Sequence, residues 1–205
     1  MCPGVQSPVG ERDPGSGRTV CGMARLVLIN GAPAIGKSTL ARRYARDHPL
    51  TLVLDVDQVR GMLGCWFDMP TEAGVLARRM AIEMAGVSLR GSHDVVVPQF
   101  LGRVDFILSL QGLCESIDAE FVEVALLSSR EDVVRRFSRR TRESSREEHR
   151  LAAELLERSG GTVELHNMYN RLMEVIAARP STRIVTSVDG QVEQTYLEFL
   201  GLVFG

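Results

Sequence analysis

The sequence predicts an α/β fold, in which a five-stranded parallel sheet is sandwiched by helices and a helical, arginine-rich lid is appended. Three observations lead to this prediction. Short apolar runs alternate with helical patterns along the chain. The runs are continuously apolar rather than alternating, which is typical of strands buried on both faces. A glycine-rich loop joins the first run to the first helix.

Length and composition suit one such domain. The chain has 205 residues, of which 44% are apolar, enough for one core and a small lid. Its 24 basic and 26 acidic residues leave a net charge of −2, so no overall positive field indicates a nucleic-acid-binding protein. The cysteines lack metal-ligand or redox spacing, which favours reduced thiols and a cytoplasmic protein. They are Cys2, Cys21, Cys65 and Cys114. No apolar run reaches the length of about 18 residues that a membrane span needs.

The first 22 residues differ from the rest of the chain. Proline and glycine recur there without periodicity, and the stretch lacks the apolar centre of a secretory signal. We therefore expect residues 1–22 to be a disordered extension and residues 23–205 to form the domain. Met23 directly precedes the first strand and is a candidate translation start.

The first strand, expected at residues 25–30, leads into a phosphate-binding loop, and a helix is expected at residues 38–46. The loop consists of Gly31, Ala32, Pro33, Ala34, Ile35, Gly36, Lys37, Ser38 and Thr39. In a Gly-x4-Gly-Lys-Ser/Thr loop the backbone N–H groups surround the nucleotide phosphates, and the lysine reaches the β- and γ-phosphates. Lys37 is the only lysine among 24 basic residues, and the planar fork of arginine would not fit its place. The loop is therefore the predicted ATP-binding site.

The second strand, expected at residues 50–56, supplies acidic groups. Asp55 and Asp57 are two positions apart, so in a strand both face the nucleotide. Phosphoryl transfer to a hydroxyl needs a base at the attacking oxygen and a magnesium ion on the phosphates. We expect Asp57 to be that base, Ser38 to bind Mg²⁺ directly and Asp55 to bind it through water. The alternative for Asp57 is a helix N-cap, because a helical pattern begins at Gln58.

Further polar residues follow the second and third strands. Arg60 lies one helical turn after Asp57, and the only tryptophan, Trp66, comes soon after it. The third strand, expected at residues 94–97, is followed by Gln99, at a point where many nucleotide hydrolases place a carboxylate. Gln99 can orient a hydroxyl but brings no negative charge to a metal. The predicted acceptor-binding residues are Asp57, Arg60, Gln99 and Arg103. Surface positions are the alternatives for the two arginines.

The fourth strand, expected at residues 120–127, precedes an arginine cluster. Residues 130–150 contain eight arginines and five acids. Helical spacing sorts several of these arginines into two rows. One row holds Arg135, Arg139 and Arg142, and the other holds Arg136 and Arg140. Arginines that close over a triphosphate neutralise its charge and exclude water. We predict a lid at about residues 135–150, with Arg139 catalytic and Arg135 on the nucleotide. The alternative is a solvated basic helix paired with its own acids.

The fifth strand is expected at residues 182–188, and a helix at residues 192–200 follows it. Asp189 and Gly190 lie between them, as a candidate contact for adenine or an ordinary turn. The four histidines show no ligand spacing, which favours structural or surface positions.

On these residues the chain, from Ala24 to Gly205, resembles the P-loop small-molecule kinases, which include gluconate and shikimate kinases, chloramphenicol phosphotransferase, polynucleotide kinase and zeta toxins. The most specific parts are the loop and the segment Asp57-Gln58-Val59-Arg60, which is similar to the Asp-x-x-Arg segment of the polynucleotide-kinase branch. The resemblance implies a P-loop NTPase fold with strand order 2-3-1-4-5, a base at Asp57, an acceptor contact at Arg60 and lid arginines at residues 135–142. Relatives often carry an acid where this chain has Gln99.

The predicted function is ATP- and Mg²⁺-dependent phosphorylation of a hydroxyl on a small molecule such as a nucleoside, sugar or antibiotic, by a monomer or homodimer. One alternative is a polynucleotide 5′-hydroxyl kinase, although the acidic charge balance and the lack of a basic aromatic platform disfavour a nucleic-acid partner. The other is a non-catalytic ATP-binding regulatory or resistance protein, which Gln99 in place of an acid suggests. No membrane partner is expected.

Overall fold

The computed structural model describes residues 23–205 except residue 146, and of residue 148 the backbone alone. The expected disordered extension, with Cys2 and Cys21, lies outside the described residues. None of the described helices combines the length and the apolar character needed to cross a bilayer.

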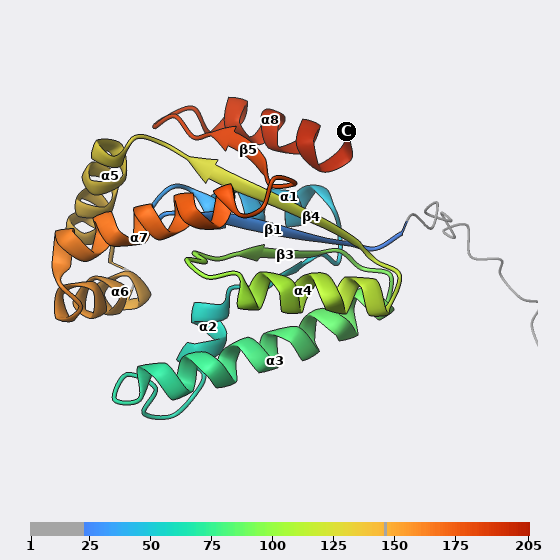
Figure 1. Cartoon of the computed structure of the whole chain (residues 1–205), viewed down its shortest axis with the longest axis horizontal. Coiled ribbons are helices and arrows are strands. Elements are labelled where there is room, and N and C mark those ends of the chain that lie inside the picture. The colour runs from blue at the N-terminus through green and yellow to red at the C-terminus, as the bar shows by residue number, and fades with distance from the viewer. Residues whose placement is uncertain (1–22, 146) are drawn as a thin grey trace, which may run out of the picture.

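Within the described range, five parallel strands form one sheet (Figure 1). They are β1 (Arg25–Gly31), β2 (Leu52–Val53), β3 (Val95–Pro98), β4 (Glu120–Leu127) and β5 (Arg183–Thr186). Their order is β2-β3-β1-β4-β5, which confirms the expected fold class and strand order. The central strand β1 places Leu28 opposite Val97 on one side and Glu123 on the other. Because the strands are parallel, their carboxyl ends meet at one edge, where ligands of such sheets gather.

Helices cover both faces of the sheet (Figure 1). The described helices are α1 (Lys37–Asp47), α2 (Val56–Gly61), α3 (Pro70–Arg90), α4 (Asp105–Ser116), α5 (Arg130–Glu143), α6 (Glu147–Arg158), α7 (Gly161–Ala177) and α8 (Val192–Phe204). Side chains of β1 alternate between two buried clusters. Val27 and Ile29 pack with residues of α1 and α8, whereas Leu26 and Leu28 pack with residues of α3 and α4. This two-sided burial explains the continuous apolar runs of the sequence.

The second strand is shorter than expected. It was predicted at residues 50–56, but β2 ends at Val53 and α2 begins at Val56. The reason is a cap: the side chain of Asp55 accepts a hydrogen bond from the backbone N–H of Asp57 at 3.0 Å, which favours helix over strand from that point. The prediction that Asp55 and Asp57 share a strand face was therefore wrong, and both lie at the start of α2.

The arginine-rich segment forms two helices packed on the domain. α5 is capped by Ser129, whose hydroxyl accepts from the backbone N–H of Asp132 at 3.1 Å. Phe137 of α5 and Leu156 of α6 join the cluster around α1. Both helices stand beyond the carboxyl end of β4, next to α7 (Figure 1). The arginines of α5 are thus held close to the end of the sheet where the glycine-rich loop lies.

Candidate active site

Two glycines shape the loop between β1 and α1. A Cβ on Gly31 would lie 2.8 Å from the carbonyl oxygen of Leu126, so only glycine permits this approach to β4. Gly36, with φ of 112°, precedes α1 in a backbone conformation that side chains disfavour. The loop therefore ends at the N-terminus of an 11-residue helix, where free N–H groups and the helix dipole favour bound anions.

Lys37 lies folded back over this loop. Its Nζ donates hydrogen bonds to the carbonyl oxygens of Gly31 and Ala32, at 2.8 and 2.9 Å. The pKa of Lys37 is lowered to about 7, chiefly by burial and also by the charge of Arg140, whereas the charges of Asp57 and Asp55 act in the opposite direction. An anion bound in the loop would stabilise the protonated amine.

Asn30 joins the loop to the segment after β3, a role that the sequence analysis missed. Its Oδ1 accepts from the backbone N–H groups of Gly31 and Leu101, at 2.8 and 2.9 Å, and its Nδ2 donates to the carbonyl oxygen of Leu101 at 3.1 Å. The side chain is almost fully buried. A polar amide at the end of an apolar strand, just before the glycine-rich loop, was the available signal.

The two acids at the start of α2 have different partners. Asp55 caps the helix, and burial raises its pKa, with a further contribution from the charge of Asp57. Asp57 does not cap the helix; its carboxylate pairs with Arg60 at 3.0 Å and lies 3.5 Å from the Nε2 of Gln99. The negative charges of both carboxylates raise the pKa of Lys37. The structure therefore brings Asp57, Arg60 and Gln99 together beside the loop.

Arg103, the remaining residue predicted to bind the acceptor, makes no recorded contact with this cluster among the described residues. The side chain of Arg103 is 85% exposed and pairs with Asp105 at 3.1 Å. By contrast, the guanidinium of Arg60 stacks over the ring of Trp66, 4.8 Å from its centroid. The half-buried Trp66 is therefore linked to Asp57 through Arg60.

Arg140 is the arginine of α5 that faces this cluster. Its charge interacts with Lys37 and Asp57, and burial lowers the pKa of its guanidinium. Its Nε is buried and has no hydrogen-bond partner within the described part of the chain. The buried Oε1 of Gln99 and Nε of Arg60 likewise lack partners among the described residues. Unpaired buried polar groups are costly, so these atoms are suited to contact a polar ligand.

The other arginines of α5 have protein partners. Arg136 is buried and donates to the carbonyl and hydroxyl oxygens of Ser187, at 2.8 and 3.0 Å. Arg139 makes two hydrogen bonds to Asp189, at 2.7 and 2.9 Å, and Arg135 pairs with Asp132 at 2.6 Å. The sequence analysis chose the row of Arg135 and Arg139 for the phosphates, whereas the row of Arg136 and Arg140 points into the domain.

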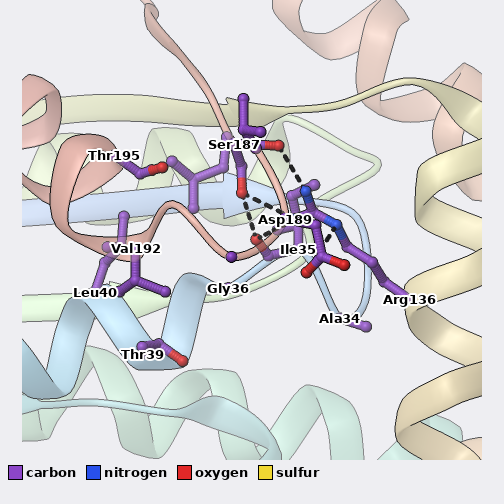
Figure 2. A pocket seen from close by; sticks show the side chains of 13 residues that line it. Ala34, Ile35, Gly36, Thr39, Leu40, Arg136, Ser187, Asp189, Val192 and Thr195 are labelled. Atoms are coloured by element: carbon purple, nitrogen blue, oxygen red, sulfur yellow. Dashed lines mark hydrogen bonds and ion pairs between the residues drawn. The ribbon is translucent and has the colours of Figure 1, made fainter.

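A cavity of about 180 Å³ adjoins the outer side of the loop (Figure 2). Gly36 and Leu40 line one wall, and Val188 and Asp189 line the other. Figure 2 shows Arg136 reaching from α5 to Ser187 and Ile35 at the rim of this cavity. The predicted turn at Asp189 and Gly190 is thus part of the wall next to the phosphate loop.

Ser38 and Asp55 fit a partial magnesium site. Ser38 is in the first turn of α1 beside Lys37, and the charge of Asp55 reaches Lys37 from the start of α2. Among the described residues, no group of three or more histidine, cysteine, aspartate or glutamate side chains forms a complete metal site. Mg²⁺ at phosphate sites takes one or two protein ligands and completes its shell with phosphates and water, which suits this pair.

Comparisons with known proteins identify the family and the fold. The family model described as AAA domain matches residues 26–160. A gluconokinase from Sinorhizobium meliloti 1021 is 16% identical with a TM-score of 0.55, covering 87% of this chain and 93% of that chain. The tunicamycin resistance protein of Deinococcus radiodurans is 13% identical with a TM-score of 0.57, covering 88% of this chain and 96% of that chain.

A chain of the Pnkp1/Rnl/Hen1 RNA repair complex is 16% identical with a TM-score of 0.56, covering 82% of this chain and 50% of that chain. At such identities the likeness shows the fold alone. A search of curated proteins found no match. The family match spans the loop, the acids of α2 and the arginines of α5. The chain therefore belongs to the AAA domain family and has the fold of the P-loop small-molecule kinases.

Proposed function

We propose that the protein is an ATP- and Mg²⁺-dependent kinase that phosphorylates a hydroxyl group of a small molecule. The observation that supports this most directly is that the charges of Lys37, Asp57 and Arg140 act on one another beside the glycine-rich loop. Phosphoryl transfer needs a cation at the β- and γ-phosphates, a carboxylate at the attacking hydroxyl and a second cation on the transferring group. These three residues match those three needs.

ATP would place its triphosphate in the loop of residues 31–39 and against the N-terminus of α1. The adenine would enter the neighbouring cavity, between Leu40 of α1 and Val188 after β5. The pair of Arg139 and Asp189 joins α5 to this wall and would exclude water from the nucleotide. Ser38 and Asp55 would hold Mg²⁺, which, when bound, neutralises charge on the β- and γ-phosphates.

Lys37 would leave the carbonyl oxygens of Gly31 and Ala32 and donate to the phosphates instead. Because its pKa of about 7 reflects burial without an anion, the phosphates would draw a proton onto the amine. The resulting ammonium would hold the phosphates of the nucleotide while the bond between the γ-phosphorus and ADP breaks. In this role a compact lysine suits the tight loop better than arginine.

Asp57 would accept the proton of the acceptor hydroxyl as its oxygen attacks the γ-phosphorus. The new P–O bond forms as the bond to the β-phosphate oxygen breaks, and ADP carries away the electron pair. Arg60 fixes the carboxylate of Asp57 at 3.0 Å, and the unpaired Oε1 of Gln99 can accept from a second hydroxyl of the acceptor. Arg140 would stabilise the charge of the transferring phosphoryl group.

A screen of acceptors tests this proposal. The purified full chain is incubated with ATP, Mg²⁺ and a pool of nucleosides, sugars, aminoglycoside-like antibiotics and 5′-hydroxyl oligonucleotides, and the products are analysed by mass spectrometry. A product heavier by one phosphoryl group, absent with Lys37→Ala and with Asp57→Asn, supports the kinase. Asp105→Asn is the matched control, because Asp105 is an exposed acid paired only with Arg103 in the described chain.

The same screen separates the alternatives. A phosphorylated oligonucleotide without any phosphorylated small molecule would favour a polynucleotide 5′-hydroxyl kinase. Tight ATP binding without any phosphorylated product, across a pool that covers each acceptor class, would favour the non-catalytic ATP-binding protein.

A further inference from the structure

Helix α3 has an apolar stripe on its outer side. The helix spans Pro70–Arg90, a length of about 32 Å at 1.5 Å per residue. The small residues Ala77, Ala81 and Ala85 face the core. The outer side carries large apolar side chains instead. They are Leu76, Met80, Met84 and Val87. Val87 is 69% exposed and Leu76 is 46% exposed, although buried positions suit such residues better.

A row of exposed charges runs along one edge of this stripe. It consists of Glu72, Arg79, Glu83 and Arg90. At 3.6 residues per turn these four positions fall within about 40° of one another around the helix. Stripe and charged row together form a continuous outer face of α3, which we call the α3 face. Figure 1 shows α3 at the rim of the molecule, with α2 and α4 on its inner side.

We propose that the α3 face is the interface of a homodimer, in which the α3 helices of two copies pack antiparallel about a twofold axis beside Ala81. This axis places residues equidistant from position 81 opposite one another. Glu72 then faces the partner's Arg90, and Arg79 faces the partner's Glu83. Because the interface is isologous, each of these pairs occurs twice.

The charged row favours one register and direction of the two α3 helices over the others. Moving the twofold axis to position 79 would place Arg79 against the partner's Arg79. Moving it to position 83 would place Glu83 against the partner's Glu83. Parallel packing would place the two charged rows at opposite edges of the interface, where they form no complementary pairs with one another. Like charges opposite one another are unfavourable, so the row favours the antiparallel register about position 81. The apolar stripe supplies the buried centre that a stable dimer needs.

The test is the mass of the full chain in solution, by sedimentation equilibrium. We expect a dimer of the 22.6 kDa chain. Glu83→Arg alone, and Arg79→Glu alone, should each raise the dimer Kd by about tenfold or more, because each change sets like charges opposite one another. The double variant with both changes should restore the dimer. Glu198→Arg, an equal charge change on the exposed side of α8, should leave it intact.

Three outcomes would overturn this proposal. The first is a monomer at every concentration up to about 100 µM. The second is a dimer that ignores Glu83→Arg, or one that the double variant does not restore. The third is a monomer that sediments with phospholipid vesicles, which would assign the α3 face to a membrane surface. Because residues 79 and 83 are also four apart within one helix, the thermal midpoint of each single variant is measured as well, and an unchanged midpoint excludes loss of folding as the cause. The measurement needs no ATP, so it stands apart from the proposed kinase activity.

Discussion

Arg139 donates two hydrogen bonds to the carboxylate of Asp189, at 2.7 and 2.9 Å, and thereby joins α5 to the loop after β5. Arg140, the next residue, interacts instead with Lys37 and Asp57. Consecutive residues of an α-helix point about 100° apart, so one turn of α5 reaches both the proposed adenine cavity and the proposed phosphoryl-transfer site. The two arginines should therefore affect different kinetic constants.

Replacing Arg140 should slow the chemical step. We expect Arg140→Ala to lower kcat by about 10²- to 10³-fold, because it removes a cation from the transferring group. Arg139→Ala should chiefly raise the KM for ATP, because it releases the wall of the proposed adenine cavity. Steady-state kinetics with the acceptor from the screen measures both. Arg142→Ala is the control, since Arg142 is exposed and pairs with Glu143. The reverse pattern would return the catalytic assignment to Arg139.

Removing the carboxylate of Asp57 should abolish turnover while sparing ATP binding. Asp57→Asn keeps the size of the side chain but cannot take the acceptor proton, so kcat should fall by about 10²- to 10⁴-fold. The Kd for ATP, from calorimetry, should change by less than about threefold, because the proposed mechanism places Asp57 at the acceptor rather than at the nucleotide. Asp105→Asn should behave as the unchanged protein. A fully active Asp57→Asn variant would show that Asp57 is not the base.

ATP binding should take up a proton at mildly alkaline pH. The pKa of Lys37 is lowered to about 7 in the free protein, so at pH 8 the amine is mostly neutral. Bound phosphates raise that pKa, so binding should take up close to one proton. It follows that ATP affinity is greatest below pH 7 and falls as the pH rises above 7. Calorimetry at pH 8 in buffers of different ionisation enthalpy measures the uptake.

The matched variant for this measurement is Lys37→Met, which keeps the side-chain length and removes the titrating group. Any remaining ATP binding by this variant should take up no proton at pH 8. Equal proton uptake by both proteins would place the titration on another group and contradict the role of Lys37.

Asn30 should be a major contributor to stability. Asn30→Ala leaves two backbone N–H groups and one carbonyl without the partners they have now, in a buried place. We expect a loss of about 2–4 kcal/mol in the free energy of unfolding, measured by urea denaturation. Asn167→Ala, on the exposed side of α7, should cost less than about 0.5 kcal/mol. A similar small loss for Asn30→Ala would show that water replaces the amide.

Several features of the fold follow from local sequence signals. The apolar runs of residues 25–30 and 120–127 correspond closely to β1 and β4, because strands buried on both faces need continuous apolar residues. The phosphate loop is equally local: Gly31, Gly36 and Lys37 are read from spacing alone. The second strand was predicted too long, because its apolar pattern continues through Val56 although Asp55 already caps the next helix.

The arginines of α5 show the limit of local signals. Spacing separated the row of Arg136 and Arg140 from the row of Arg135 and Arg139, but both rows have the same chemistry. Which row turns inward depends on Val133 and Phe137, which pack into the core and set the rotation of α5. Asn30 is similar, since its partner at Leu101 is 71 residues away in sequence.

The sequence by itself determined that this protein has a parallel α/β sheet, a phosphate-binding loop with one lysine and acids directly after the second strand. These features depend on residue type and short-range spacing, which a chain displays before it folds. Only the tertiary structure decided that the charges of Asp57 and Arg140 act on Lys37, that Gln99 lies beside Asp57, and that the outer side of α3 keeps its apolar residues exposed. Those relationships join residues far apart in the chain, and the packing of helices on the sheet sets them.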